Sequence, residues 1–552
     1  MASLRLCLAM IASIFSVASA AQRNWIVGQA VSTTSGVLLG HASEFAPDVS
    51  EYLGAPFAEP PVGELRWAAP VRFSASGEFN ASSFGNACPR LPGNNNLNAL
   101  SKWFANLTDA GAAILTIQSA ANDTFSEDCL TVNVWTKPQA GAASKPVIVF
   151  VHGGAFSSGD CSNPFESGAV FADEQDVVFV TFNYRLSIMG FPGHNDTEKV
   201  PYNLGLRDQR LAIEWIRDNI AAFSGDPDRI TLFGSSAGAA SLDYFSYAYV
   251  DDPIVSSFIP ASGTATSFGA IQPDAAAQKW FTVSETLGCG GASTDPDALL
   301  SCMRGKSTDE VMSAIPPVAG FSALQSSFTA TVDETLVFAD YTNRTPVARP
   351  VLIGSNDAEA ELFEATAALK GSTFTTDFWA TVTHAVFTCP AALRANRSLN
   401  AGQPTWRYRF AGASFPNVRL SGNAYHGAWH GSQNVVMFGN ARLSGPPDTE
   451  AEGRLAEYMR GAWAAFARDP ERGLVEYGWP VYDPAERTLV QLGETGRNET
   501  GANFTVGDAY DGSCGTREEV TATRIATAAT TTATATASSS ASAAGPASGV
   551  SV

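Results

Sequence analysis

The sequence is poor in positive charge and contains no long apolar run. Lysine and arginine together number 34 against 54 aspartates and glutamates, which gives a formal net charge of −20 at pH 7. This balance argues against nucleic acid and anionic membranes as main partners, because both repel an acidic surface. No stretch stays apolar over the roughly 20 residues that a membrane-spanning helix needs, so no transmembrane anchor is predicted.

Charged residues of both signs are scarce, at 16% of the chain, whereas 45% of the residues are hydrophobic. A chain of this composition can bury a substantial core, which excludes a disordered protein over most of its 552 residues. The length exceeds that of most single domains but suits one large α/β catalytic domain with insertions. We therefore expect one catalytic domain over residues 21–515.

The two ends of the chain differ in composition from the rest. Residues 1–20 combine Arg5, an apolar stretch and the small residues Ala18-Ser19-Ala20, which together predict a cleaved signal peptide. Residues 516–552 consist mainly of Thr, Ala and Ser and are expected to form a disordered tail. We therefore predict a secreted protein. Eight N-x-S/T sequons are compatible with that route, at Asn80, Asn106, Asn122, Asn195, Asn343, Asn396, Asn498 and Asn503.

The cysteines of the mature chain are odd in number, because removal of the signal peptide also removes Cys7. In a secreted protein an odd count leaves one thiol free or paired with another chain. Spacing alone does not give the connectivity. The remaining cysteines are Cys88, Cys129, Cys161, Cys289, Cys302, Cys389 and Cys514.

Four short apolar runs rich in β-branched and aromatic residues predict buried strands. They cover residues 147–151, 177–182, 230–233 and 351–353. Between the second and third runs, the apolar spacing of residues 206–222 predicts a helix packed on a sheet. Alternating buried strands and helices indicate a largely parallel sheet that is covered on both faces.

The third of these runs leads directly into Gly234-Ser235-Ser236-Ala237-Gly238, a G-x-S-x-G pattern. Glycines on both sides of the central serine allow a sharp strand-to-helix turn that exposes the serine at the sheet edge. Ser236 is therefore the candidate nucleophile. Because short Gly/Ser strings also arise by chance, the remaining parts of a catalytic site have to be found independently.

A serine hydroxyl needs a base to take its proton and an acid to orient that base. In α/β-hydrolases the chain order is serine, acid, histidine, which leaves His384, His426 and His430. His384 lies within residues 378–387, which look like a packed helix, so a structural role is favoured for it. His426 and His430 lie in a Gly-rich loop, where catalytic residues are more often found.

Two carboxylates qualify as the acid. Asp357 and Glu359 closely follow the predicted strand 351–353, which places both at the same end of the sheet as the serine. Glu361 and Glu364 come next, and we expect them on a solvated helix face.

A tetrahedral oxyanion requires preorganised N–H donors, and the small residues of a loop after the first strand allow backbone to approach a ligand. That loop is His152-Gly153-Gly154-Ala155-Phe156. Gly154 and Ala155, together with Ala237 after the nucleophile, can offer three backbone N–H groups. A simple glycine turn is the alternative, but the position after a buried strand and upstream of Ser236 favours an oxyanion hole.

Several longer motifs occur in the right order beside these residues. They include Tyr52–Pro61, Glu127–Val134, Asn183-Tyr184-Arg185 and Asn203–Gln209, and they resemble the type-B carboxylesterase/lipase family, which includes cholinesterases and secreted fungal lipases. The likeness extends from about Val27 to about residue 515. It implies an α/β-hydrolase fold and an ester hydrolase that uses neither metal nor cofactor.

The resemblance selects among the open alternatives. The spacing of the family acid after its strand-ending glycine implies Glu359, and that of the family histidine before a Phe-Gly pair implies His430 rather than His426. The residue after the acid, Ala360, departs from the usual glycine. The family also implies the disulfides Cys88–Cys129, Cys289–Cys302 and, less firmly, Cys389–Cys514, with Cys161 as the spare thiol, and the structural ion pairs Arg66–Glu127 and Arg185–Asp208.

Two departures from the cholinesterases bear on the substrate. The residue before the nucleophile is Ser235 instead of Glu, and Ser119 stands where cholinesterases have a cation-binding Trp, so a choline ester is not expected. An acyl ester or lipid is the favoured small-molecule substrate. In related lipases the Cys88–Cys129 loop is a mobile lid, and a loop packed on the domain is the equal alternative. Its apolar residues here are Leu97, Leu100, Trp103, Phe104, Leu107, Ile114, Leu115 and Ile117.

The leading hypothesis is a secreted serine ester hydrolase that forms an acyl-enzyme. The alternative is a catalytically inactive adhesion or binding module of the same fold. A peptidase could use the same triad, but the family resemblance does not favour it. The sequence does not indicate the oligomeric state.

Overall fold

The computed structural model describes residues 25–90, 102–103, 105–118, 124–138, 144–317, 327–412, 415–423, 425–494, 500–512 and 514. The predicted signal peptide and carboxyl-terminal tail lie outside these residues, as do Leu97, Leu100, Phe104 and Ser119 of the Cys88–Cys129 loop.

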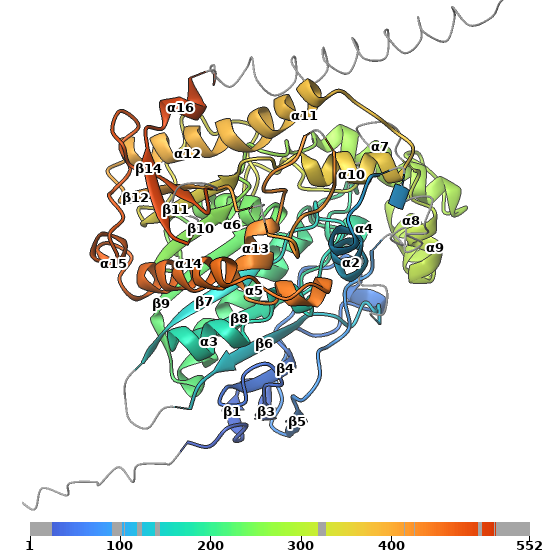
Figure 1. The fold of residues 1–552 in the computed structure, drawn as a ribbon. Coiled ribbons are helices and arrows are strands. Elements are labelled where there is room, and N and C mark those ends of the chain that lie inside the picture. Colours follow the sequence, from blue (N-terminus) through green and yellow to red (C-terminus); the bar gives the residue numbers. More distant parts are fainter. Residues whose placement is uncertain are drawn as a thin grey trace, which may run out of the picture.

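Within the described residues, eleven strands form one sheet in the order β14-β13-β12-β11-β10-β9-β7-β8-β6-β4-β3, and three form a small sheet, β1-β2-β5 (Figure 1). All neighbours from β13 to β8 are parallel, and antiparallel pairs stand at both ends of this row. The predicted, largely parallel sheet is therefore confirmed. The strands are β1 Val31–Thr33, β2 Gly36–Leu39, β3 His41–Ala42, β4 Ser50–Pro56, β5 Glu78–Asn80, β6 Thr131–Thr136, β7 Lys145–Val151, β8 Val178–Phe182, β9 Gly225–Ser235, β10 Ser257–Ala261, β11 Val351–Asn356, β12 Thr405–Phe410, β13 Leu489–Leu492 and β14 Ala502–Thr505.

Both faces of this sheet are buried. Along β7, Val147, Val149 and Val151 join a core that includes side chains of α5 and α6, whereas Ile148 and Phe150 join a second core with side chains of α3 and α14. Alternate side chains of one strand point to opposite faces, so these two cores lie on opposite sides of the sheet. The helical segments are η1 Gly63–Leu65, α2 Asp109–Gln118, η2 Pro164–Glu166, α3 Ala169–Gln175, α4 Ser187–Gly190, α5 Leu204–Asn219, η3 Ile220–Phe223, α6 Ala237–Ala248, α7 Pro273–Thr286, α8 Pro296–Arg304, α9 Thr308–Ser313, α10 Glu361–Leu369, α11 Thr376–Val382, η5 Thr383–Thr388, α12 Cys389–Asn400, α13 Ser432–Met437, η6 Ala441–Ser444, α14 Glu450–Arg468, α15 Gly473–Glu476 and α16 Asp508–Asp511.

The four strands expected from apolar runs are present as β7, β8, β9 and β11, and β9 is longer than its run because it begins at Gly225. The helix expected over residues 206–222 ends as an α-helix at Asn219 and continues as a 3₁₀ turn. Asn219 explains this end, because its side chain donates to the carbonyl of Trp215 at 2.8 Å and accepts from Thr34 N at 2.8 Å. The change from α-helix to 3₁₀ helix therefore occurs where Asn219 contacts Thr34.

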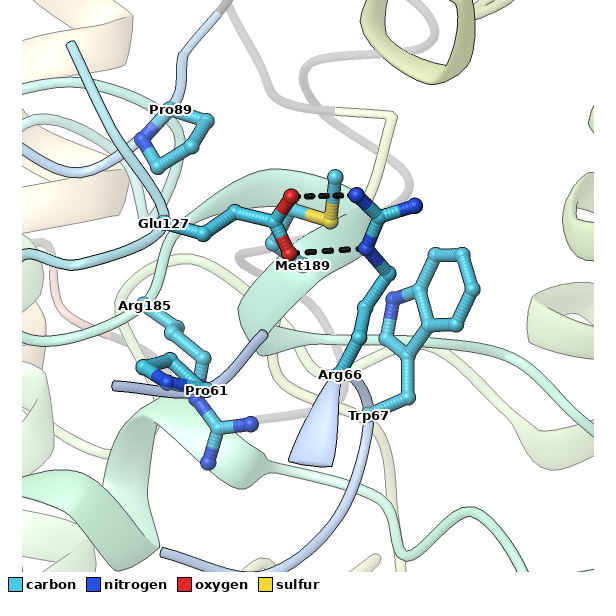
Figure 2. A pocket seen from close by; sticks show the side chains of 7 residues that line it. All are labelled: Pro61, Arg66, Trp67, Pro89, Glu127, Arg185 and Met189. Atoms are coloured by element: carbon cyan, nitrogen blue, oxygen red, sulfur yellow. Dashed lines mark hydrogen bonds and ion pairs between the residues drawn. The ribbon is translucent and has the colours of Figure 1, made fainter. Parts of the chain in front are cut away.

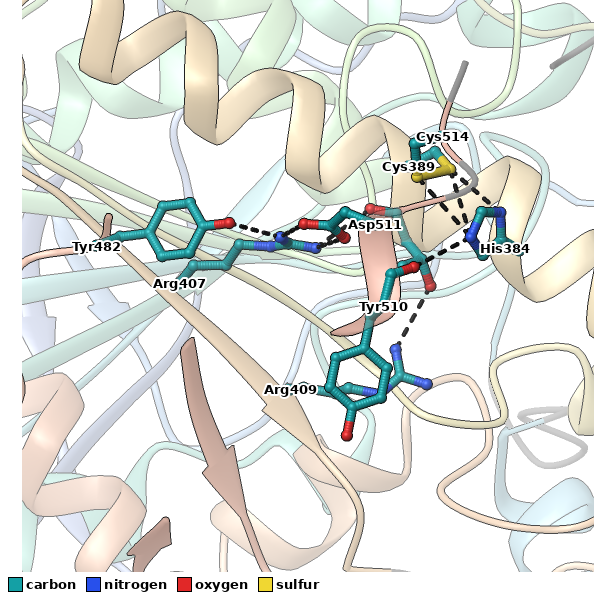
Figure 3. The surroundings of a disulfide bond; sticks show 9 residues. His384, Cys389, Arg407, Arg409, Tyr482, Tyr510, Asp511 and Cys514 are labelled. Atoms are coloured by element: carbon teal, nitrogen blue, oxygen red, sulfur yellow. Dashed lines mark hydrogen bonds and ion pairs between the residues drawn. A yellow bond between two sulfur atoms is a disulfide. The ribbon is translucent and has the colours of Figure 1, made fainter. Parts of the chain in front are cut away.

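The three disulfides implied by the family resemblance are present, at Cys88–Cys129, Cys289–Cys302 and Cys389–Cys514, and Cys161 is a free, buried thiol. Cys389–Cys514 attaches the end of the described chain to the start of α12 (Figure 3).

An ion pair and a histidine contact reinforce this carboxyl-terminal attachment. Asp511 accepts a hydrogen bond from Nη2 of Arg407 on β12 at 2.8 Å. His384 Nε2 lies 3.1 Å from the carbonyl oxygen of Tyr510, and Nδ1 lies 3.1 Å from the Sγ of Cys389 (Figure 3). The last described segment is therefore held both covalently and by polar contacts.

Candidate active site

Ser236 occupies the turn between β9 and α6. Its backbone has φ 58° and ψ −122°, a conformation that is uncommon for a residue with a side chain. Its N–H donates to the carbonyl of Ala261 at 2.9 Å, and its carbonyl accepts from Ala240 N at 2.9 Å. A Cβ on Gly234 would lie 2.7 Å from the backbone of Gly238, so the G-x-S-x-G turn requires glycine where strand and helix cross. These features match a sharp turn that presents a nucleophile.

His430 and Glu359 form a direct contact. Nδ1 of His430 lies 2.6 Å from Oε2 of Glu359, whose second oxygen accepts from the Asn356 N–H at 2.7 Å. Glu359 is fully buried, and His430 is 7% exposed. Among the described residues, Nε2 of His430 has no hydrogen-bond partner although it is buried. A histidine held at Nδ1 by a carboxylate, with Nε2 left for another group, can act as a general base.

Parallel strands bring these residues to one edge of the sheet. Ser236 follows β9, Glu359 follows β11, and β10 lies between the two strands and pairs with both of them. The carbonyl of Glu359 also accepts the backbone N–H of His430 at 3.2 Å, which draws the histidine loop to the end of β11. The carboxyl ends of parallel strands are where α/β folds place their sites.

The other carboxylates that follow β11 bind backbone groups of neighbouring loops. Asp357 accepts the N–H of Ala428 at 2.7 Å and thus supports the loop before His430 instead of the imidazole. Burial raises the pKa of Asp357, and the Arg409 charge opposes this rise.

The prediction that Glu361 lies on a solvated helix face is wrong. Glu361 is 1% exposed, because it accepts hydrogen bonds from two loops, and burial raises its pKa to about 7.

The two other histidines make contacts of a different kind. His384 sits beside the Cys389–Cys514 disulfide, as expected for a structural residue, although its segment forms the π-helix η5 instead of a continuous α-helix. His426 is exposed, and its Nδ1 lies 3.1 Å from the carbonyl of Asn423.

The loop after β7 lies against the nucleophile turn. A Cβ on Gly153 would stand 2.8 Å from Cβ of Ser236. Gly154, Ala155 and Phe156 all have positive φ values, of 106°, 53° and 59°. Successive residues in such conformations can turn their N–H groups toward a common anion site.

The three candidate oxyanion donors lie in the loop after β7 and at the start of α6. Within the described part of the chain, the N–H groups of Gly154, Ala155 and Ala237 donate to no protein acceptor. At the start of the loop, the imidazole of His152 is stacked on Tyr184 at a centroid distance of 4.5 Å, and the Tyr184 hydroxyl donates to the His152 carbonyl at 3.0 Å. Burial lowers the pKa of His152, which favours a neutral ring at this position.

Two phenylalanine rings cover the His430 imidazole. The Phe387 and Phe363 centroids lie 4.8 Å and 5.3 Å from that of His430, and a third ring, Phe268, lies 5.9 Å from Phe387. Sequence reasoning did not find these rings, because they come from three separate segments and carry no motif. They give the histidine an apolar surrounding.

A separate, very small cavity lies beside the expected structural ion pair Arg66–Glu127 (Figure 2). Nε of Arg66 donates to Glu127 at 2.7 Å, and Arg66 Nη1 donates to the carbonyl of Arg304 at 3.3 Å. The second expected pair is also present, since Arg185 donates to both carboxylate oxygens of Asp208. Both pairs support loops, as the family resemblance implied.

Comparison with known proteins identifies the family of this chain. A family model described as "Carboxylesterase family" matches residues 28–378 and 366–506. The chain belongs to the carboxylesterase family. Members of this family are carboxylic ester hydrolases with the α/β-hydrolase fold, and both statements hold for this chain.

Two fungal carboxylesterase relatives match over most of their length. Chlorogenic acid esterase of Aspergillus niger is 31% identical over 494 residues, which cover 85% of this chain and 91% of the relative. Secreted lipase 5 of Gibberella zeae is 31% identical over 498 residues, covering 84% and 90%. Acetylcholinesterase of Danio rerio is 33% identical over 297 residues, covering 52% of this chain and 43% of the relative.

The described part of this carboxylesterase contains no helix with the length and hydropathy of a membrane-spanning segment. In the Cys88–Cys129 loop, Ile114 of α2 is fully buried, and Leu107, Leu115 and Ile117 pack on the domain core. Trp103 is 72% exposed. The described part of the loop thus combines a packed helix with two exposed aromatic side chains, since Phe125 is also 44% exposed.

Proposed function

We propose that this carboxylesterase is a secreted serine hydrolase in which Ser236, His430 and Glu359 form the catalytic triad. The observation that carries the proposal is the 2.6 Å contact between His430 Nδ1 and Glu359, with Nε2 left unpartnered among the described residues at the sheet edge that holds Ser236. A triad needs this arrangement, because the acid fixes the tautomer in which Nε2 accepts the serine proton.

In the proposed reaction, the hydroxyl oxygen of Ser236 attacks the ester carbonyl while His430 Nε2 takes the proton. The oxyanion of the tetrahedral intermediate is bound by the N–H groups of Gly154, Ala155 and Ala237. His430 then donates the proton to the leaving alcohol, which produces the acyl-enzyme. Water repeats the sequence, releases a carboxylic acid and restores the serine.

We infer an ester with an apolar or aromatic group on at least one side. The support is the cluster of Phe268, Phe363 and Phe387 next to His430, which offers an apolar surface to a group bound at the imidazole. The names of the relatives agree, since one is an esterase of chlorogenic acid and another a lipase. The uncharged Ser235 does not favour a cationic alcohol.

Secretion is proposed from the predicted signal peptide, the sequons and the relative named a secreted lipase. Asn80, Asn106, Asn195 and Asn343 are exposed, so a glycosyl group could be accommodated at each. Release of glycosidase-sensitive protein into the culture medium would support this route. Retention of the whole product inside the cells would contradict it.

Labelling with a serine-directed organophosphate tests the triad. The reagent should modify Ser236, identified by peptide mass spectrometry, and abolish hydrolysis of p-nitrophenyl esters. A fully active protein with unmodified Ser236 would refute the assignment. An inactive protein that does not react would instead favour the adhesion or binding module.

A series of p-nitrophenyl esters of increasing acyl length, measured with and without an oil–water interface, tests the substrate class and the role of the Cys88–Cys129 loop. We propose that the part of this loop around the exposed Trp103 acts as a lid that meets an apolar surface, while α2 stays packed on the domain. Interface-dependent activation on long acyl chains is then expected. Equal rates with and without the interface would favour a loop that stays packed on the domain.

A further inference from the structure

The segment that carries Glu359 and the segment that carries His430 are held together at several points. Besides the acid–histidine contact, Asp357 accepts the N–H of Ala428 at 2.7 Å, and Glu361 Oε2 accepts the N–H of Gly427 at 3.0 Å. Carboxylates on both sides of Glu359 therefore bind the backbone immediately before His430.

Glu361 differs from Asp357 because it also binds a second loop. Its Oε1 accepts hydrogen bonds from the hydroxyl of Ser421 at 2.7 Å and from Ser421 N at 3.2 Å. The carboxylate is buried and bridges two backbone segments. Hydrogen bonds to a charged acceptor are stronger than neutral ones, so this bridge fixes both segments.

The second loop holds the described part of the Cys88–Cys129 loop. Ser421 forms an antiparallel bridge with Leu107, and Thr108 N donates to the carbonyl of Leu420 at 3.1 Å. Gly111 of α2 packs so tightly on Leu420 that an added Cβ would stand 2.0 Å from its carbonyl oxygen. Movement of α2 away from the domain therefore requires a change at residues 420–421, which Glu361 holds.

We propose that Glu361 is a positioning residue that couples docking of α2, in the described part of the Cys88–Cys129 loop, to the placement of His430. Docking of α2 fixes the backbone at residues 420–421. Glu361 binds both Ser421 and Gly427, so it also restricts the backbone at Gly427, which leads into His430. The inference rests on the proposed role of His430 as general base. It adds that the docked position of α2 supports a high catalytic rate through the buried carboxylate of Glu361.

The first test replaces Glu361 by Gln and measures kcat and KM on a soluble p-nitrophenyl ester at pH 8, where the wild-type carboxylate is ionised. E361Q keeps the side-chain shape but removes the charged acceptor, so kcat should fall about tenfold with KM within about twofold of wild type. The control is E457Q, at an exposed position of α14, which should keep kcat within about twofold because Glu457 lies on a different helix from Glu361.

A double-mutant cycle tests the coupling itself. Thr108→Val removes the hydroxyl that accepts the Gly111 N–H at 2.9 Å and donates to the Arg419 carbonyl, so kcat should fall about fivefold. If docking acts through Glu361, the double variant T108V/E361Q should lose less than the product of the single losses. Hydrogen exchange at Thr108–Ile114 should also accelerate in E361Q, a change that a role confined to the histidine loop would not produce.

The outcomes separate this inference from the proposed function. If wild-type protein hydrolyses no ester, the proposed function fails. If it is active but E361Q keeps full kcat, or E457Q loses as much, or the losses of T108V and E361Q multiply, the coupling is overturned. Should E361Q not fold, Ser421→Ala removes one bond of the same bridge and should lower kcat about threefold with unchanged KM, and an unchanged kcat would overturn the proposal.

Discussion

His430 Nδ1 lies 2.6 Å from Glu359 Oε2, although the two residues are 71 positions apart in the chain. From this contact we predict that H430A loses about 10⁶-fold in kcat, whereas H426A, which alters an exposed ring in the same loop, keeps most of the activity. Steady-state kinetics on a p-nitrophenyl ester check the difference. Comparable losses of kcat in both variants would mean that activity depends on the loop conformation and not on the imidazole of His430.

Gly153 gives a second prediction. Because an added Cβ would stand 2.8 Å from Cβ of Ser236 and 2.9 Å from the Ser235 carbonyl oxygen, G153A should displace the oxyanion loop from the nucleophile turn. We expect a loss of about 10²–10³ in kcat, the size of effect seen when an oxyanion donor is misplaced. Circular dichroism should show a folded variant. Wild-type kcat in a folded G153A would contradict the proposed donor geometry.

The thiol of Cys161 should be inert in the folded protein. It is buried, its Sγ lies 3.1 Å from Nδ2 of Asn133, and burial raises its pKa, so little reactive thiolate forms. Titration with a chromogenic disulfide reagent should detect no thiol before denaturation and one equivalent afterwards. Rapid labelling of the native protein would show that this region opens.

Buried acids predict how stability changes with pH. Burial raises the pKa of Glu452 on α14 to about 7, above the usual value of 4.5. The folded state therefore binds this proton more tightly than the unfolded state, so the stabilisation is complete below pH 4.5 and is lost as the pH rises through 7. The thermal midpoint of the wild type should fall between pH 5 and pH 8, and E452Q should flatten this dependence. An equal slope in both proteins would exclude Glu452 as a cause.

The main features of the fold and the turn that carries Ser236 could be predicted because they depend on local signals. Buried apolar runs predicted the four parallel strands, and the G-x-S-x-G turn identified Ser236 from the space that a strand-to-helix crossing requires. The choice of Glu359 over Asp357 needed the family resemblance. Local chemistry does not distinguish two carboxylates that follow the same strand.

Other features were not predictable because they depend on distant contacts. Glu361 is an acidic residue at the start of a helix, a position that is usually exposed. It is buried here because the loops of Ser421 and Gly427 bind its carboxylate. The rings of Phe363 and Phe387 meet at His430 from different helical segments. Likewise, the π-helix around His384 occurs where the helix turns toward the Cys389–Cys514 disulfide. No single window of sequence contains these relationships.

The backbone of Ser236 has a φ of 58°, a conformation that costs stability in a residue with a side chain. A glycine there would adopt the same conformation without steric cost, which should make an S236G protein more resistant to heat by about 1 kcal/mol or more in unfolding free energy. The same change would remove the hydroxyl of the proposed nucleophile. Selection for thermal robustness alone would therefore favour an inert protein, and a serine retained here marks a fold that tolerates local instability in exchange for chemistry.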